Sequence, residues 1–383
     1  MVEGELPVKF RVDRDAMTDA VLWASRTLPS KSTQPLLTGL HLVADKQGLV
    51  LSGSDADVSA RASLDAAVGA TGTVLVPGRL LADITRSFPS ASTIEFVVEG
   101  SRAEITCGKS SFTIPTMPVA EYPPLPAMPD ISGSVTASDF AAAVAQVVVA
   151  SSRDETLPAF TGIKVDVEGS TITMAATDRY RLAVRELDWS PQSTSISTHA
   201  LVPAKFMFDA AKTLSHNSAV SLAFTSSSEG LIGIAGDNRQ TTSRLLAADF
   251  PKYQTLLPSE SSSVAQISTA TLIEAVKRVS LVLDREAPVK IHFANGEAVI
   301  SGGGGSGEIA EARENIECAL AGDDVTIAFN HQFLLDGLGA IDAPVAVISM
   351  TAPHRPAVIT GAKEIDAEQI DAFKYLLMPI RQP

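Results

Sequence analysis

The strongest constraint on the fold is that the sequence repeats itself at the spacing of a whole domain. The segment PLLTG at residues 35–39 recurs as PAFTG at residues 158–162, 123 residues later. The segment LVPGR at residues 75–79 recurs 126 residues later as LVPAK at residues 201–205, and a third copy of this helix start begins at Phe329. A repeat of this length exceeds the roughly 20–45 residues of a solenoid unit and has the size of a domain. The 383 residues are therefore expected to form three similar domains.

Proline- and serine-rich segments mark the ends of the repeats. The first repeat closes on EYPPLP at residues 121–126, the second on a segment from FPKY to LP at residues 250–258, and the third on YLLMP at residues 375–379. Prolines and serines crowd the first two of these places, as is typical of domain boundaries. We therefore expect domains at residues 1–126, 127–258 and 259–383.

Each repeat reads as a helix, strands, a second helix and further strands. Apolar residues recur at helical spacing over residues 16–26. Apolar runs flank residues 46–48, and further runs flank Gly169, which supplies the positive φ that a tight hairpin needs. Pro77 and Pro203 suit the first turn of a helix, because the N–H that proline lacks has no helical partner there. Hairpin-linked strands make antiparallel sheets, so we predict an α+β fold with two helices in each domain.

The composition is that of a globular protein with an acidic surface. Hydrophobic residues make up 45% of the chain and charged residues 19%. The sequence contains no apolar run long enough to cross a membrane and begins with acidic residues rather than a signal peptide, so we expect a cytoplasmic protein without a membrane partner. The net charge of −14 repels nucleic acid on average, unless the basic residues gather on one face.

A search for catalytic motifs favours a chain without an active site. The segment at residues 108–110 resembles the end of a phosphate-binding loop but lies between strands, and the glycine run at residues 302–307 lacks a surrounding βαβ unit. Both segments are expected to be hairpin turns. No nucleophile elbow, metal-ligand spacing or paired carboxylates appear, so we predict no catalytic residue, no metal and no cofactor. The polar segment from Asp178 to Arg181 leaves open either an active site or the end of a hairpin.

Basic residues recur at matched positions of the second helix in two repeats. Arg79 and Arg86 are seven residues apart and share a helix face, and Lys205 and Lys212 repeat this spacing. An ordinary solvated helix face would explain any one of these residues, but the matched recurrence favours a shared basic surface. Such a surface would contact phosphates without reading bases, which predicts sequence-independent binding of nucleic acid.

Two further motifs carry a resemblance to a known family. They are ATDRYRLA at residues 176–183 and YLLMPIR at residues 375–381, and they accompany the repeated helix starts and seams. With them, essentially the whole chain resembles the bacterial replicative sliding clamp, the beta processivity subunit of the replicative DNA polymerase. The resemblance implies a non-enzymatic, head-to-tail homodimer that closes into a clamp-like ring around double-stranded DNA. It also implies a hydrophobic pocket between the second and third domains that binds short peptide motifs of the replicative polymerase, the clamp loader and repair proteins.

The resemblance also assigns residues by position. The peptide-binding pocket would use Phe160, Thr177, Tyr180, Arg181, Leu182, Pro251, Leu256, Leu376, Met378, Pro379, Ile380 and Arg381. The DNA-facing residues would be Lys31, Arg79, Arg86, Arg153, Lys205 and Lys212, and the dimer interface would include Phe112, Leu281 and Leu283. The chain departs from the family where Arg179-Tyr180 replace a frequent Gly-His, and where Gln382-Pro383 follow the last arginine in place of leucine.

Two other functions remain compatible with the residues alone. A repeat scaffold that binds proteins but not DNA would have the same three domains. An enzyme with its site around Asp178 and Arg181 would need a turnover reaction that depends on Asp178. A ring accounts best for the charge, because an acidic exterior with a basic lumen repels DNA outside and accepts it inside.

Overall fold

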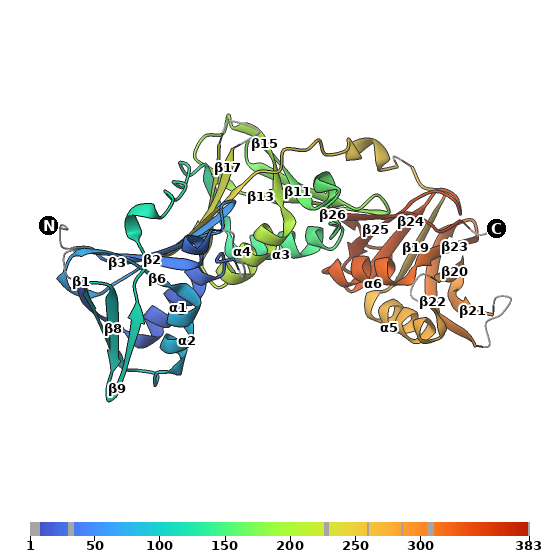
Figure 1. Cartoon of the computed structure of the whole chain (residues 1–383). Coiled ribbons are helices and arrows are strands. Elements are labelled where there is room, and N and C mark those ends of the chain that lie inside the picture. The colour runs from blue at the N-terminus through green and yellow to red at the C-terminus, as the bar shows by residue number, and fades with distance from the viewer. Residues whose placement is uncertain are drawn as a thin grey trace. The chain divides into compact units, whose positions relative to one another are not determined.

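The computed structural model describes residues 8–29, 34–225, 230–258, 260–284, 287–304 and 310–381. These residues form six α-helices and 26 β-strands, and the strands pair in antiparallel hairpins (Figure 1). Two helices fall in each sequence repeat, so the predicted α+β fold is confirmed. No helix in this part of the chain is both long and apolar enough to cross a membrane.

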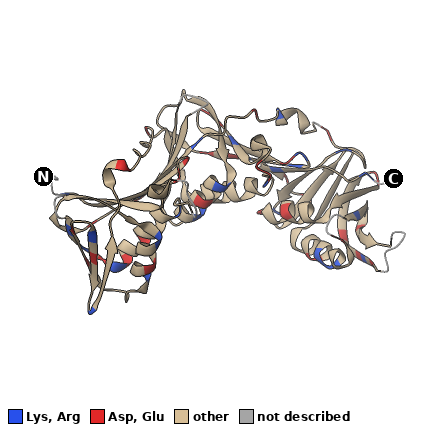
Figure 2. Cartoon of the chain, in the orientation of Figure 1, with Lys and Arg blue, Asp and Glu red and all other residues tan. Residues whose placement is uncertain are grey.

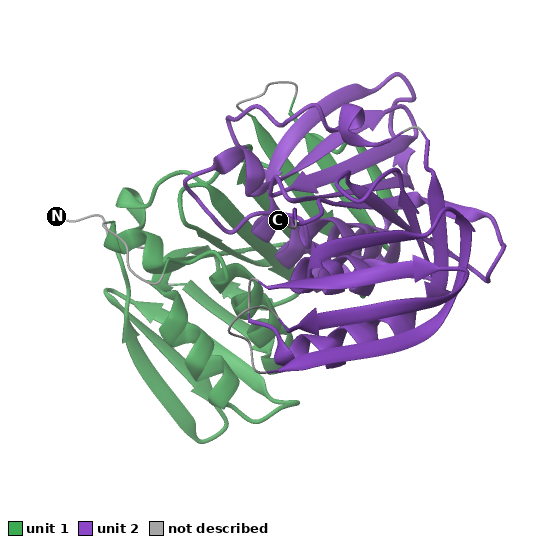
Figure 3. Ribbon diagram, turned by 90° about the vertical axis from the view of Figure 1, so that its right-hand side faces the viewer, with its two compact units in different colours: residues 1–135, 216–245 green, residues 136–215, 246–383 purple. Residues whose placement is uncertain are grey.

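The chain divides into two compact units (Figure 3). Unit 1 contains residues 1–135 and 216–245, and unit 2 contains residues 136–215 and 246–383. The last three strands of the central repeat, residues 219–244, therefore belong to unit 1, because strand pairing joins them to a strand of the first repeat.

Unit 1 contains two helices, a five-stranded sheet and the larger part of a second sheet. The helices are α1 (Arg14–Ser25) and α2 (Gly78–Ser87). The first sheet has the order β5 (Ala67–Ala70), β1 (Val8–Asp13), β7 (Thr93–Glu99), β8 (Arg102–Cys107) and β9 (Ser110–Pro115). The second runs through β10 (Gly133–Thr136), β16 (Ala219–Phe224), β17 (Leu231–Gly236), β18 (Arg239–Arg244), β4 (Val58–Leu64), β3 (Gly48–Ser54), β2 (Gly39–Asp45) and β6 (Gly72–Pro77).

Unit 2 contains four helices and a twelve-stranded sheet. The helices are α3 (Ala137–Val148), α4 (Ala204–Leu214), α5 (Thr269–Val279) and α6 (His331–Ala340). The sheet runs through β15 (Ser197–Pro203), β11 (Gly162–Glu168), β12 (Thr171–Thr177), β13 (Arg181–Asp188), β26 (Gln369–Leu377), β25 (Ala357–Ala362), β24 (Val345–Met350), β19 (Ser263–Ser268), β22 (Glu311–Gly322), β21 (Gly296–Gly303), β20 (Pro288–Ala294) and β23 (Val325–Asn330). A two-residue strand, β14 (Ser190–Pro191), completes the elements of this unit.

Local sequence explains where the helices and strands begin. The carboxylate of Asp13 accepts hydrogen bonds from the backbone N–H groups of Asp15 and Ala16, which caps α1. Pro77 and Pro203 stand directly before α2 and α4, one residue earlier than the sequence suggested. Strand β1 alternates buried and exposed residues, and its Phe10 ring stacks on Phe96 of β7 with centroids 4.8 Å apart. Strand β1 therefore buries one face and leaves the other to solvent.

The predicted hairpin turns form where glycine permits them. Gly48 and Gly169 have φ values of 131° and 57° between paired strands, as expected. Gly108, with φ 58°, turns β8 into β9, so the segment that resembled a phosphate-binding loop is a hairpin turn. Strands β21 and β22 pair up to Gly303 and Glu311, while residues 305–309 of the predicted glycine-rich tip lie outside the described residues.

Candidate functional site

The loop between β12 and β13 is fixed by its own polar side chains. The Thr177 hydroxyl donates to the backbone carbonyl of Arg181 at 2.6 Å. A carboxylate oxygen of Asp178 accepts from the backbone N–H groups of Tyr180 and Arg181, each at 3.1 Å. Arg179 adopts a φ of 81°, a left-handed conformation that non-glycine residues rarely take. The loop therefore presents the side chain of Tyr180, which is 56% exposed, to solvent.

Arg181 is held inside the protein rather than presented to a ligand. Its guanidinium donates to Asp178 at 2.9 Å and to Asp336 of α6 at 2.6 Å, and it lies 4.2 Å from the centre of the Phe333 ring. Burial alone would lower the pKa of Arg181, but Tyr375 and the two carboxylates outweigh it and raise this pKa above its ordinary value. Arg181 thus ties the β12–β13 loop to α6.

A buried apolar cluster lies beside this loop. Leu182 of β13 pairs with Leu376 of β26, and both pack with Tyr253 and Val358. Phe250 and Leu257, which lie in the segment before β19, pack against the same cluster. Burial raises the pKa of Tyr253 to about 12, and the carboxylates of Asp166 and Glu186 act in the same direction. This buried cluster would form the apolar floor of the predicted peptide-binding pocket.

Two apolar side chains near this cluster in sequence are exposed. Met378, two residues after Leu376, is 41% exposed, and Leu256, three residues after Tyr253, is 49% exposed. The backbone N–H of Met378 donates to the carbonyl of Tyr180 at 2.9 Å, and that of Ile380 donates to Ala328 at 2.8 Å. Residues 378–380 are thus held by their backbone while the Met378 side chain stays accessible.

The structure brings five of the twelve predicted pocket residues together. Thr177, Arg181, Leu182, Leu376 and Met378 meet around the β13–β26 pairing. Of the others, Phe160 ends the 3₁₀ helix η3 (Pro158–Phe160) with its ring centre 5.8 Å from the guanidinium of Arg179, and Tyr180 stacks with Phe333 at 6.3 Å. In sequence, Pro251 precedes and Leu256 follows Tyr253 of the buried cluster. Pro379 and Ile380 are half-buried, and Arg381 is exposed.

Sequence reasoning missed two residues of α6. Phe333 and Asp336 contact Arg181 through its ring and its carboxylate, respectively. They are three residues apart on a helix and therefore share a face. This spacing is the feature of the sequence that could have indicated them. That face lies more than 150 residues from Arg181 in sequence, so no local pattern connected them.

Close packing of α6 against β26 gives a stability prediction. A Cβ at Gly337 would overlap the ring of Tyr375, which is fully buried and donates its hydroxyl to the Phe333 carbonyl at 2.8 Å. Gly337→Ala should therefore lower the free energy of unfolding by about 1–3 kcal/mol. Gly339 of the same helix faces open space, so Gly339→Ala should instead raise it by about 0.5–1 kcal/mol. Denaturant unfolding of both variants measures this, and equal shifts would contradict the packing described.

The predicted basic residues of α2 and α4 are exposed, and an aspartate lies between the two basic residues of each helix. Helix α2 carries Arg79, Asp83 and Arg86, and helix α4 carries Lys205, Asp209 and Lys212 at the same spacing (Figure 2). Arg86 pairs with Asp83 at 3.1 Å, and Arg79 donates to the Leu28 carbonyl at 3.3 Å. Each helix therefore offers a net charge of +1 from these three residues, weaker than the arginines and lysines alone suggested. Arg153 is exposed between α3 and η3, and Lys31 lies outside the described residues.

The predicted interface residues differ in exposure. Phe112 of β9 is 39% exposed and meets Phe88 edge to face at 5.6 Å. Leu281 lies in the 3₁₀ helix η5 (Ser280–Val282) and is 84% exposed. Leu283 packs beside Gly302. Leu281 is thus the most accessible of the three.

Three family descriptions match successive parts of the chain. They are the N-terminal, central and C-terminal domains of the DNA polymerase III beta subunit, at residues 8–126, 134–252 and 254–381. A beta sliding clamp of Streptomyces coelicolor is 50% identical over 98% of this chain and 99% of that protein, and one of Micrococcus luteus is 42% identical over 82% of this chain and all of that protein.

Solved structures give the same result. The sliding clamp of Bacillus subtilis covers 98% of this chain and all of its own with 26% identity and a TM-score of 0.91. A Pseudomonas aeruginosa clamp bound to griselimycin matches over the same shares with 25% identity and a TM-score of 0.90. These findings confirm the family resemblance inferred from the two sequence motifs. The chain belongs to the DNA polymerase III beta subunit family, the sliding clamps, which are processivity factors rather than catalytic enzymes.

Proposed function

We propose that this protein is a replication clamp whose two copies close head to tail into a ring around double-stranded DNA. Each copy would contribute three domains, at residues 1–126, 127–258 and 259–383. Retention on DNA is then topological, so that tight local binding is unnecessary and sliding is allowed. No cofactor is required, and the cytoplasm is the place where such a ring meets its DNA.

One observation supports the proposal that partners dock here: exposed apolar side chains lie next to a buried apolar cluster. Tyr180 and Met378 are joined by a backbone hydrogen bond next to the paired Leu182 and Leu376, and both side chains are exposed. Leu256, also exposed, lies three residues after Tyr253 of the buried cluster. A partly exposed methionine suits varied ligands, because its flexible side chain repacks around them. Since Arg181 is engaged by Asp178 and Asp336, we assign the capture of a peptide carbonyl or carboxylate to the exposed Arg381.

Such a pocket explains how a clamp confers processivity. The replicative polymerase, the clamp loader and repair proteins would each insert a short peptide motif. A polymerase tethered in this way stays at high effective concentration near its template without any new contact to DNA. The basic residues of the lumen would be Arg79, Arg86, Arg153, Lys205, Lys212 and Lys31, and the ring contact would join Phe112 of one copy to Leu281 and Leu283 of the other.

Fluorescence anisotropy with a labelled peptide of the Gln-Leu-x-Leu-Phe type tests the docking pocket. The full chain should show saturable binding, and a chain ending at Leu377 should bind at least about tenfold more weakly, because the lost Met378 and Ile380 each offer about 1.5–3 kcal/mol of apolar burial. An unchanged melting temperature of the shortened chain is the control for folding. Equal binding by both chains would remove the pocket assignment.

A further inference from the structure

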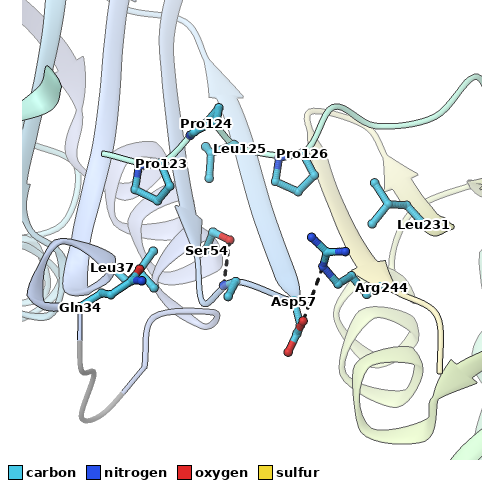
Figure 4. A pocket seen from close by; sticks show the side chains of 11 residues that line it. Gln34, Leu37, Ser54, Asp57, Pro123, Pro124, Leu125, Pro126, Leu231 and Arg244 are labelled. Atoms are coloured by element: carbon cyan, nitrogen blue, oxygen red, sulfur yellow. Dashed lines mark hydrogen bonds and ion pairs between the residues drawn. The ribbon is translucent and has the colours of Figure 1, made fainter. Parts of the chain in front are cut away.

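Unit 1 contains a pocket of about 410 Å³ that no described function uses (Figure 4). Its walls come from Leu37 of the 3₁₀ helix η1 (Pro35–Thr38), from Ser54 at the end of β3, from Asp57 in the β3–β4 loop, and from Leu231 and Arg244 of β17 and β18. The segment Pro123–Pro126 lies across the pocket as a further wall. We call this the unit 1 pocket.

The loop of the unit 1 pocket repeats the loop of the docking site in unit 2. The Ser54 hydroxyl donates to the Val58 carbonyl at 3.0 Å, as Thr177 does to Arg181. Asp55 accepts from the backbone N–H groups two and three residues later, at 3.1 and 2.8 Å, as Asp178 does. The next residue has a left-handed φ in both loops, 101° at Ala56 and 81° at Arg179. The two loops therefore have the same construction.

The neighbouring strands repeat as well. Val58 of β4 pairs with Ser243 of β18, as Arg181 of β13 pairs with Leu377 of β26. The backbone N–H of the following residue then donates across at 2.9 Å in both places, from Arg244 to Asp57 and from Met378 to Tyr180. Arg244 and Asp57 thus occupy the positions of Met378 and Tyr180.

Further repeat-mates complete the correspondence. Leu37 stands 123 residues before Phe160, in a 3₁₀ helix of the same kind, and PLLTG aligns with PAFTG. The segment EYP ending at Pro123 corresponds to DFP ending at Pro251. The unit 1 pocket is therefore a second copy of the docking site, built on the preceding pair of repeats.

The two copies differ in the chemistry of their rims. Where unit 2 exposes Tyr180 and Met378, unit 1 has an ion pair of Asp57 and Arg244. The Arg244 Nε lies 3.6 Å from the Asp57 Oδ1, and the side chains of Asp57 and Arg244 are 76% and 65% exposed. A pair so open to solvent contributes little stability, so the Arg244 guanidinium is available to another carboxylate. Leu37, Leu125 and Leu231 supply the apolar part of the pocket.

We propose that the unit 1 pocket is a second docking site, for an extended peptide that carries an aliphatic side chain beside a carboxylate. The leucines would take the aliphatic side chain, and Arg244 would exchange Asp57 for the carboxylate of the ligand. That the ligand is a peptide rests on the docking function proposed for unit 2, whereas the charge preference rests on the unit 1 pocket itself.

The test uses the full chain carrying Met378→Glu, which disables the docking site of unit 2 at an exposed residue. The probes are Gln-Leu-Asp-Leu-Phe and Gln-Leu-Asn-Leu-Phe, both amidated at the C-terminus so that they differ by one carboxylate, and calorimetric titration measures their binding. The Asp peptide should bind about fivefold more tightly than the Asn peptide, since an exposed ion pair adds up to about 1 kcal/mol. Adding Arg244→Glu should remove this preference, whereas Lys109→Glu, the same charge change at a distant turn of unit 1, should leave it.

Photo-crosslinking locates the bound peptide. A benzoylphenylalanine in place of the peptide Phe should label residues 123–126 or 231–244. Absence of binding to the Met378→Glu chain, a preference that survives Arg244→Glu, or labels confined to unit 2 would overturn the second docking site. Failure of the unit 2 proposal has a different signature: the unaltered chain would then bind no more tightly than the Met378→Glu chain, while the Arg244-dependent preference stays.

Discussion

Reversing Arg79, Arg86, Lys205 and Lys212 to Glu is expected to lower the amount of clamp loaded onto circular DNA by at least about 100-fold, because each basic contact with a phosphate releases a counterion and is replaced by repulsion. The four side chains are exposed on α2 and α4, so the substitutions should leave the fold and the dimer intact. Asp83 and Asp209, which already reduce the charge of the two helices, should make the reversed surface strongly repulsive.

A matched variant separates the position of the charges from their number. Arg102, Lys109, Lys290 and Lys363 are also exposed, and reversing these four changes the net charge of the chain equally. This control should load onto circular DNA nearly as well as the unaltered protein. The amount of labelled clamp that elutes with gel-filtered plasmid measures loading, and equal amounts for the two variants would contradict the lumen assignment.

Leu281→Lys is expected to convert the dimer largely into monomers. Leu281 is 84% exposed in the isolated chain, and a ring contact would bury it. Replacing it loses about 2 kcal/mol of apolar burial and adds the desolvation of an ammonium group, so each contact should weaken by more than about 100-fold. Sedimentation over a range of protein concentrations measures the dissociation.

Ile365→Lys provides the control for this interface. Ile365 is 50% exposed in the same unit and has no assigned role in the ring, so its substitution should leave the dimer unchanged. Dimers of equal stability in both variants would show that Leu281 lies outside the contact. Phe112 and the Phe88 ring beside it would then be the residues to substitute next.

The sequence predicted what is local and what repeats. Helical spacing placed α1 to within two residues, and glycines placed the turns at Gly48 and Gly169. The repeated segments at residues 35–39 and 158–162 each contain a 3₁₀ helix, so the repeat in sequence corresponds to a repeat in structure. These features depend on short-range sterics and hydrogen bonds, which the sequence expresses directly.

Contacts between distant residues could not be predicted in the same way. The pairing of β18 with β4 carries the end of one repeat into the sheet of another, and no period in the sequence contains that information. For the same reason the motif around Arg181 suggested a residue that faces a ligand, whereas Asp336 and Phe333 of α6 hold its side chain inside. The positive φ of Arg179 was equally hidden, because only the closed loop selects it.

Residence on circular DNA, before and after the circle is linearised, tests the ring most directly. The labelled clamp is loaded onto a nicked plasmid by its clamp loader, freed of unbound protein, and followed while a restriction enzyme linearises half of the sample. We predict that the clamp stays on the circle and leaves the linear DNA by sliding off its ends. Equal retention on both forms, or binding to neither by a folded dimer, would contradict a sliding ring and favour a protein scaffold.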